Sequence, residues 1–398
     1  MGQKVVKSIS SIPKVSGWQP PIMFDLSNQA DTSKLQKLIE QNEVNFVSDE
    51  ISEAIEELYH MYNPTEIDKV DQVNYSEFIK KFTSEGGTYD AYGTWVYYPW
   101  SQNLVHFPQK DDFRKLRGLR NRNLITEDER QKLISNKTIL ILGLSVGSNV
   151  ADLLLLQGIG SRYILVDMDS LSPTNLNRIR VGYEQVGIHK VDVVAKKLSG
   201  LDPFLEQVHY KSGINEINLE EILTKYKPDI IVDEMDSLRM KMVIRTRAKE
   251  MGIPVVMATD NGDNILLDIE RFDEQEDLPI LHGILPDNIL NDILNNKEMS
   301  RREAGAIIGR YFVDLKNVPL RMIESLLEVG RTIPSWPQLG GAAVLSGLYV
   351  AYAVKKIILN QPLSTGRFLM GPDYQLDPSI ATAKYNAQKD KLIEIMTK

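Results

Sequence analysis

With 398 residues, the chain is long enough for two domains, or for one large domain with attachments, around a substantial core. Its 54 acidic and 46 basic side chains give a formal net charge of −8, which argues against a general nucleic-acid or anionic-membrane binder. The absence of cysteine excludes disulfides, thiolate metal ligands, a cysteine nucleophile and a thioester carried by the chain itself.

Two stretches bear on location. The start, "MGQKVVKSISSIPKVSGWQPP", has lysines but no continuous apolar run, so no secretory signal is expected. The most apolar stretch, "LGGAAVLSGLYVAYAVKKIIL" (339–359), is rich in Gly, Ala and Ser, and we interpret it as a buried helix rather than a membrane span. The prediction is a cytoplasmic protein without membrane partners.

Residues 1–110 are predicted to form an N-terminal α+β accessory region. Residues 1–30 carry Pro13, Pro20 and Pro21 and indicate an extended arm. "SDEISEAIEELYHMYNP" has helical periodicity, with Ser48 as the expected cap, and "DQVNYSEFIKKF" predicts a second helix. "GGTYDAYGTWVYYPWSQNLVHF" predicts a hairpin. Its aromatic residues are interpreted as packing rather than a ligand cage: Trp95, Tyr97, Tyr98 and Trp100.

From residue 137 to about 262, short Val/Ile/Leu runs alternate with helix-length polar segments. This rhythm is typical of a Rossmann-like α/β fold, a mostly parallel sheet with crossover helices. The next run, "NILLDIERF", predicts an antiparallel extension of that sheet. We therefore divide the chain into the accessory region (1–110), a nucleotide-binding domain (111–290) and a C-terminal helical segment that completes it (291–398).

The first strand leads into a glycine turn. "TILILGLSVGSNV" places Gly143 at the strand end and Gly147 with Ser148 at the start of a helix, where free N–H groups favour phosphate. The next strand ends in Asp167, at about the 20-residue separation expected of an acid that binds ribose. A turn-capping role for Asp167 is the alternative, but the order of the elements favours a nucleotide site.

The segment after that acid, "DMDSLSPTNLNRIR", carries more charge than a dehydrogenase requires. Arg178, and Lys190 further on, are interpreted as cations aimed at a polyphosphate on which charge builds during reaction. The alternative is that both are solvated surface charges. The pattern favours chemistry at phosphorus.

These residues resemble the ThiF/MoeB/HesA family, whose adenylation domain is shared with ubiquitin-activating enzymes. The family's glycine turn, DxD strand end, NLxR segment, downstream lysine and later aspartate correspond to "GLSVGS", "DMD", "NLNR", Lys190 and "VDEMDS". The resemblance covers about residues 115–270. It implies an adenylyltransferase that uses ATP and Mg²⁺ and acts as a homodimer.

By that resemblance, Asp167 would hold the ribose, while Asn175, Arg178 and Lys190 would contact the triphosphate. Asp236 would hold Mg²⁺, with Asp233 as an alternative ligand or a helix cap. The implied nucleotide-binding set is Gly143, Ser145, Gly147, Ser148, Asp167, Asp169, Asn175, Arg178 and Lys190. The implied catalytic set is Arg178, Lys190, Asp236 and Arg120.

Arg120 comes from "FRKLRGLRNRN" (113–123), where "RGLRN" has the spacing of a family motif. In the family an arginine of that motif reaches the ATP of a partner subunit. By the resemblance, Arg120 corresponds to that arginine, and Arg117 corresponds to the arginine that precedes it in the motif. A solvated helix face is the plainer interpretation of this basic stretch, and an RNA-binding patch is a weaker one. ATP binding across a dimer is favoured because the stretch precedes the first strand.

Two family features are missing. Without the paired CxxC motifs no structural zinc is expected. Without the relay cysteine the chain could form an acyl-adenylate but could not carry the thioester itself. The five histidines form no i, i+4 pair and no HExxH motif: His60, His106, His189, His209 and His282.

The expected reaction is attack of a carboxylate or amide oxygen on the α-phosphate of ATP. A peptide substrate is the first choice, followed by the C-terminus of a ubiquitin-like or sulfur-carrier protein, and then by a carboxylated tRNA nucleoside, which the acidic balance disfavours. An NAD-dependent oxidoreductase and an inactive scaffold are alternatives of other classes. "TDNGD" is interpreted as a solvated turn around Asn261 and Gly262, with Asp260 and Asp263 facing the substrate as the alternative.

Overall fold

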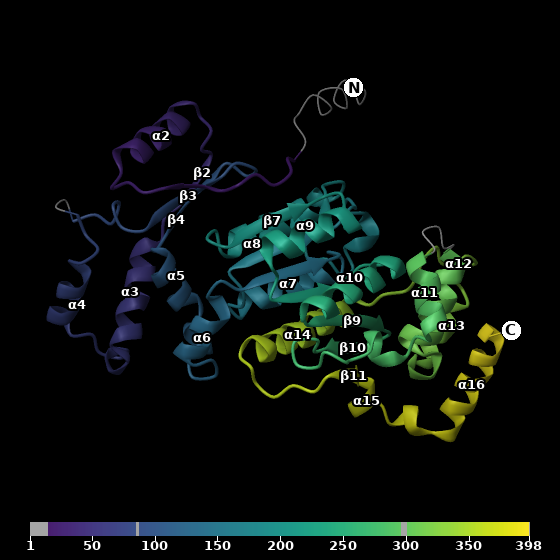
Figure 1. Ribbon diagram of the computed structural model, residues 1–398. Helices are drawn as coiled ribbons and strands as arrows, with labels where there is room; N and C mark the ends of the chain where they lie inside the picture. The colour runs from purple at the N-terminus through teal and green to yellow at the C-terminus, as the bar shows by residue number, and fades with distance from the viewer. Residues whose placement is uncertain (1–14, 85–86, 296–300, 398) are drawn as a thin grey trace, which may run out of the picture. The chain divides into compact units, whose positions relative to one another are not determined.

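The computed structural model describes residues 15–84, 87–295 and 301–397 (Figure 1). The chain divides into two compact units, and each is described by itself. The smaller comprises residues 1–128 together with a short excursion, 199–204, while the larger comprises 129–198 and 205–398. The predicted division at 110 and 290 remains a prediction.

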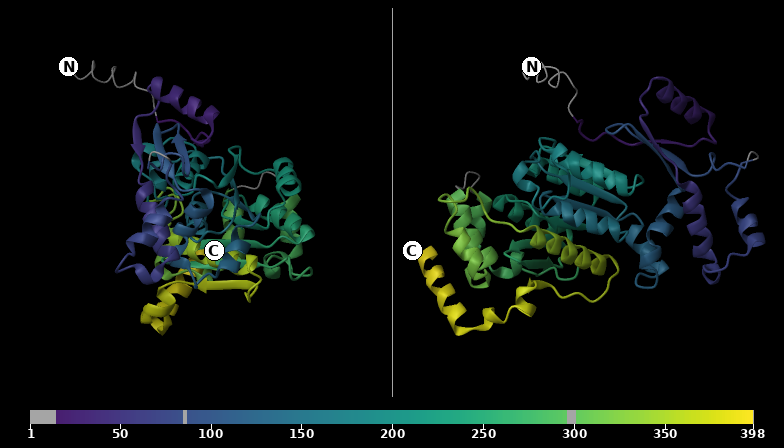
Figure 2. Two further views of the ribbon diagram at one scale, coloured as in Figure 1. Left: turned by 90° about the vertical axis from the view of Figure 1, so that its left-hand side faces the viewer. Right: turned by 180° about the vertical axis from the view of Figure 1, so that it is seen from behind.

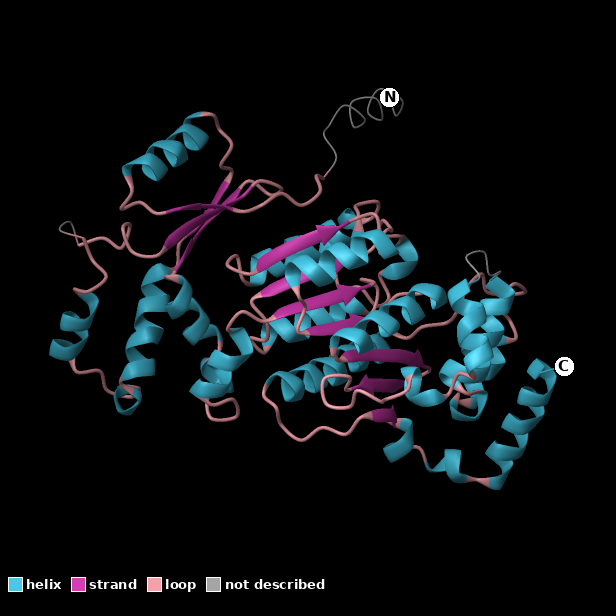
Figure 3. Ribbon diagram, in the orientation of Figure 1, coloured by secondary structure: helices cyan, strands magenta, loops and turns pink. Residues whose placement is uncertain are grey.

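A four-stranded sheet organises the smaller unit, in the order β1-β3-β4-β2 (Figure 3). The strands are β1 (Ile22–Phe24), β2 (Phe46–Ser48), β3 (Thr94–Tyr98) and β4 (Asn103–Phe107). The helices are α2 (Gln29–Glu40), α3 (Ile51–Tyr62), α4 (Gln72–Ile79) and α5 (Lys110–Arg117). The predicted hairpin is the antiparallel pair β3–β4, and both predicted helices are present as α3 and α4.

Two details of this unit differ from expectation. Ser48 belongs to β2, and Glu50 occupies the N-cap position of α3 without a side-chain hydrogen bond, so the predicted serine cap is wrong. The predicted arm lies partly outside the described residues, and its described part contains β1, which pairs with β3. Trp95 and Tyr97 are buried against Phe24 and Leu35 of the same unit, as packing residues.

The larger unit is built on a seven-stranded sheet in the order β11-β10-β9-β8-β5-β6-β7. Its strands are β5 (Thr138–Leu142), β6 (Arg162–Val166), β7 (Glu206–Tyr210), β8 (Ile230–Asp233), β9 (Val255–Asn261), β10 (Asn264–Glu270) and β11 (Gly366–Met370). β5 to β9 are parallel, while β10 and β11 add antiparallel strands. The predicted α/β fold with an antiparallel extension is confirmed.

Helices cover both faces of this sheet (Figures 1 and 2). α9 (Glu216–Tyr226) and α10 (Leu238–Met251) pack on the face presented by Leu140 and Leu142. α7 (Gly147–Leu156) starts against Ile141, which alternates to the opposite face of the strand. The remaining crossover helix is α8 (Lys190–Leu201).

The C-terminal segment is mostly helical and also contributes β11 to the sheet. Its helices are α11 (Asp287–Asn295), α12 (Arg301–Ile307), α13 (Leu320–Leu326), α14 (Gly340–Ile358), α15 (Asp373–Leu376) and α16 (Ala383–Thr397). Among the described helices, α14 alone is long and apolar enough to cross a membrane, and half of its apolar stretch is buried inside the protein. It packs on α7, β9 and β10, which agrees with the predicted buried helix.

Candidate functional site

The predicted nucleotide residues meet at the carboxyl edge of the parallel strands. Leu142 pairs with both Val166 and Asp233, so the segments that follow β5, β6 and β8 start side by side. In open α/β sheets this edge is where ligands bind. The sheet register therefore brings together motifs that are nearly 100 residues apart in sequence: Gly143, Asp167 and Asp236.

Gly143 makes the turn between β5 and α7 possible. Its φ of +83° is unfavourable for residues with a side chain, and a Cβ here would lie 2.4 Å from the backbone oxygen of Glu234. Gly147 opens α7, and Ser148 behind it is buried and donates its hydroxyl to the Ser145 carbonyl at 2.9 Å. The result is a tight turn that leads into a helix N-terminus, the arrangement expected for phosphate.

Asp167 fixes this turn from the neighbouring strand. Its carboxylate is buried and accepts hydrogen bonds from the N–H groups of Leu144 and Asp169, both at 2.8 Å. Lys190, at the start of α8, lies 3.7 Å from Asp167 and 2.8 Å from the exposed carboxylate of Asp169. Asp167 thus has the turn-capping contacts considered above, and its ribose-binding role stays a prediction.

Arg178 lies directly beside the glycine turn. Its Nε donates to Ser145 Oγ at 2.8 Å, and its Nη1 donates to the Thr174 carbonyl and to Asn177 Oδ1 at 3.1 and 2.9 Å. All three acceptors are neutral. Burial lowers the pKa of Arg178, and the negative charges of Asp260 and Asp236 oppose that shift. Arg178 is therefore a half-buried cation whose charge is compensated only at longer range.

Asn175 has a structural contact of its own. Its Oδ1 accepts the Ser172 N–H at 2.9 Å and completes a capping box around the short helix Pro173–Asn175. The side chain is buried at 8% exposure. Its predicted contact with the triphosphate remains a prediction, and the capping contact constrains the backbone just before Arg178.

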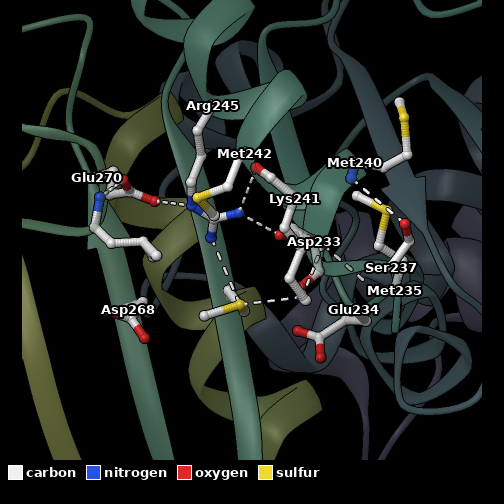
Figure 4. Close-up of polar contacts among 12 residues, drawn as sticks. Asp233, Glu234, Met235, Ser237, Met240, Lys241, Met242, Arg245, Asp268 and Glu270 are labelled. Carbon is white, nitrogen blue, oxygen red and sulfur yellow. Dashed lines mark hydrogen bonds and ion pairs between the residues drawn. The ribbon is translucent and has the colours of Figure 1, made fainter. Parts of the chain in front are cut away.

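Asp236 and Asp233 have very different surroundings. Asp236 is exposed in the loop after β8. Asp233 is fully buried and forms ion pairs with Lys241, at 3.0 Å, and with Arg245, which in turn binds Glu270 at 2.7 Å (Figure 4). Burial would raise the pKa of Asp233, but the charges of Lys241 and Arg245 outweigh it and hold the pKa low.

These surroundings favour Asp236 over Asp233 as the predicted metal ligand, because the carboxylate of Asp233 is already bound by two cations. Within the described ranges, no group of three or more His, Asp or Glu side chains is arranged to hold a metal. A magnesium ion at Asp236 would therefore take most of its oxygen ligands from phosphate and water, as Mg²⁺ commonly does.

Asp260 lies near the carboxyl end of β9, next to the position where the sequence interpretation expected a solvated turn. The predicted solvated turn is confined to Gly262 and the exposed Asp263, while Asp260 and Asn261 are buried within β9. Burial raises the pKa of Asp260 to about 6. The only sequence signal for the location of Asp260 was its position near the carboxyl end of a predicted strand. The hydrophilic "TDNGD" stretch favoured a solvated turn instead.

The basic stretch 113–123 belongs to the smaller unit. Arg114 and Arg117 lie 3.3 and 3.4 Å from the buried carboxylate of Asp202, so these two arginines bind the excursion 199–204. These ion pairs differ from the plainer interpretation of the basic stretch, in which its charged side chains would form a solvated helix face. Arg120 is exposed in the 3-10 turn Leu119–Asn121, and its proposed role across a dimer stays a prediction.

Residues 119–262 match the ThiF family. This match agrees with the family resemblance that the sequence motifs indicated. It is 33% identical over 285 residues to uncharacterized protein MT1398 of Mycobacterium tuberculosis, covering 71% of this chain and 38% of that protein.

Two further relatives match about a third of the chain. Ubiquitin-like modifier-activating enzyme 5 of Aedes aegypti is 27% identical over 152 residues, covering 35% of this chain and 37% of that protein. The tRNA threonylcarbamoyladenosine dehydratase of Bacillus subtilis is 29% identical over 130 residues, covering 32% and 50%. The chain thus spans half or less of the length of these curated relatives. A crystal structure of E. coli MccB with ATP aligns at 16% identity and a TM-score of 0.46, covering 81% of this chain and 84% of that one.

Proposed function

We propose that the chain is an ATP-dependent adenylyltransferase that activates a carboxylate or amide of a peptide or protein substrate as an acyl-adenylate. The observation that carries this proposal is Arg178, held beside the glycine turn by Ser145 with no carboxylate among the hydrogen-bond acceptors that the described residues offer it. Such a cation is available to a triphosphate. An NAD-dependent oxidoreductase gives it no task.

In the proposed reaction, an oxygen of the substrate attacks the α-phosphorus of ATP. The bond from that phosphorus to the bridging oxygen of the β-phosphate breaks, and pyrophosphate leaves. Arg178 and Lys190 stabilise the charge on the phosphates, and Asp236 supplies a carboxylate to Mg²⁺. With no cysteine in the chain, the acyl group passes to a nucleophile from the substrate, water or another protein. The expected homodimer, with Arg120 reaching the partner's ATP, and the cytoplasmic location belong to the proposal.

The edge strand β2 supports a peptide substrate. β2 is an outer strand of its sheet, and Phe46 and Val47 are 68% and 61% exposed. An exposed edge strand offers backbone groups and side-chain contacts to an extended peptide. For a peptide found to be adenylated, Phe46→Lys should raise KM and leave kcat unchanged, whereas Leu124→Lys, also in this unit and 87% exposed, should change neither. Equal KM values for the two variants would exclude β2 as the peptide site.

The nucleotide is tested by titration calorimetry with MgATP and separately with NAD. Wild-type protein should bind ATP in a magnesium-dependent way, and Arg178→Ala should weaken that binding by about 10²-fold. Arg247→Ala is the matched control, because Arg247 pairs with Glu220 on the outer helices of the same unit. Tight NAD binding that ignores both ATP and Arg178 would replace the proposal with the oxidoreductase.

Two other substrate classes remain. A ubiquitin-like or sulfur-carrier protein is supported by the match to ubiquitin-like modifier-activating enzyme 5, and a tRNA by the match to the tRNA threonylcarbamoyladenosine dehydratase. The acidic balance disfavours the tRNA. Mass spectrometry of a co-expressed peptide, carrier protein and tRNA pool separates the three, because only the true substrate changes mass.

A further inference from the structure

A buried carboxylate lies at the same edge of the sheet as Arg178. Asp260 is 5% exposed and accepts hydrogen bonds from Ser346 Oγ at 2.9 Å and from Gln338 Nε2 at 3.3 Å. Both donors come from the start of α14 and the residues just before it. The C-terminal segment therefore supplies the partners of an acid that is located among nucleotide-site residues.

The same segment also holds the loop that carries Arg178. Asn177 Nδ2 donates to the backbone oxygen of Gln338 at 2.8 Å. Gly340 lies so close to this loop that a Cβ would be 2.2 Å from the Asn177 carbonyl oxygen. Gln338 thus binds Asp260 through its side chain and Asn177 through its backbone, which makes a continuous path from β9 to Arg178.

Charge completes the arrangement. The carboxylates of Asp260 and Asp236 both favour the charged form of Arg178, against the effect of burial. Asp236 is exposed and is the predicted magnesium ligand, whereas Asp260 is enclosed by protein donors. Asp260 is therefore the fixed counter-charge of Arg178. Ser145 is the fixed hydrogen-bond acceptor of Arg178.

We propose that Asp260, Ser346 and Gln338 form a positioning group that holds Arg178 toward the triphosphate, so that the start of α14 is part of the nucleotide site. This inference rests on the proposed function in assigning Arg178 to ATP. None of the three residues needs to touch the nucleotide. The family match ends at residue 262, before both donors of this group.

The first experiment reads the position of Arg178 without any nucleotide. The Arg178 Nε–H donates to Ser145, so its side-chain hydrogen exchange, measured by NMR and assigned with Arg178→Lys, reports on how firmly it is held. Asp260→Asn and Ser346→Ala should each accelerate that exchange about tenfold. Asp268→Asn is the control, because Asp268 is a buried acid of the adjacent strand that pairs with Arg367. Unchanged exchange in both variants, or equal acceleration in the control, would overturn the inference.

The second experiment is a double-mutant cycle on MgATP affinity. Asp260→Asn should weaken binding by about 10- to 100-fold when Arg178 is present, and by little in an Arg178→Ala background. Equal weakening in both backgrounds would show that Asp260 does not act through Arg178. If the wild-type protein binds no MgATP, the proposed function fails, while the exchange measurement still decides whether the positioning group exists.

Discussion

The glycine turn after β5 depends on the backbone conformation of Gly143. A comparison of Gly143 with Gly158 separates the cost of a positive φ from the cost of a steric clash. Gly143→Ala meets both a φ of +83° and a contact of 2.4 Å with the Glu234 oxygen, whereas Gly158→Ala meets a φ of +70° in open space. We expect Gly158→Ala to lower the free energy of unfolding by about 1 kcal/mol and Gly143→Ala to lower it by more than twice that. Chemical denaturation of both variants checks this; equal losses would show that Glu234 moves aside at no cost.

Asp260 gives the stability of the protein a pH dependence of its own. Between the ordinary aspartate pKa of 3.8, which applies to the unfolded chain, and the folded pKa of about 6, the folded chain binds the proton more tightly than the unfolded chain. The stability that this group contributes therefore falls as pH rises through that interval. Relative to wild type, Asp260→Asn should gain on the order of 2–3 kcal/mol between pH 4 and pH 6.5. Denaturation curves at these pH values test it, with the exposed Asp263→Asn expected to show no such gain.

Among single residues, the sequence predicted those candidate site residues that have a characteristic pattern in their immediate sequence neighbourhood. Gly143 and Asp167 stood out because a glycine turn and a strand-end acid have characteristic spacing, and the structure places them together. Asp260 and Ser346 have no such signature, since their contact joins residues 86 positions apart. Asn175 shows a third case: its side chain completes a capping box with Ser172, while the role that the family resemblance implies for it stays a prediction.

At the scale of elements, α10 depends on one buried arginine. Arg245 is fully buried and joins Asp233 of β8 to Glu270 of β10, so its removal leaves Glu270 without its cation and Asp233 with Lys241 alone (Figure 4). We expect Arg245→Met to lower the free energy of unfolding by about 3–5 kcal/mol. Arg247→Met, two positions along the helix in a half-exposed pair with Glu220, should cost about 1 kcal/mol or less. Thermal or urea unfolding compares them; similar losses would mean that the buried network contributes nothing specific.

Elements were predictable where a pattern is local and repeated. The Val/Ile/Leu runs predicted the parallel strands because buried strands need continuous apolar residues. The prediction that Ser48 caps α3 was wrong because Ser48 pairs with Val105 of β4. Local capping rules do not include such a tertiary contact. The same limit applies to the Asp233–Arg245–Glu270 network, whose members come from three elements.

At the scale of the whole molecule, the order of motifs predicted the α/β unit and its extension, but not the excursion 199–204. That segment consists of the last residues of α8 and the turn after it, yet it belongs with the smaller unit. Nothing local marks it, because Asp202 looks like an ordinary residue after a helix until its arginines are located. Within the charge run 113–123, Arg114 and Arg117 bind this acid, while the proposed role of Arg120 at a partner's ATP stays a prediction.

The excursion yields a prediction about how the chain unfolds. Asp202 is 1% exposed and is bound by Arg114 and Arg117, so Asp202→Asn should cost about 2–3 kcal/mol and the loss should be confined to the smaller unit. Hydrogen exchange read by mass spectrometry should show lower protection in α5 and unchanged protection in β5. Asp229→Asn is the reciprocal control, because Asp229 binds Lys137 and the Thr138 N–H in the larger unit and should lower protection there. If either variant loosens both units alike, the two units unfold as one, and the excursion is then a structural link rather than a boundary.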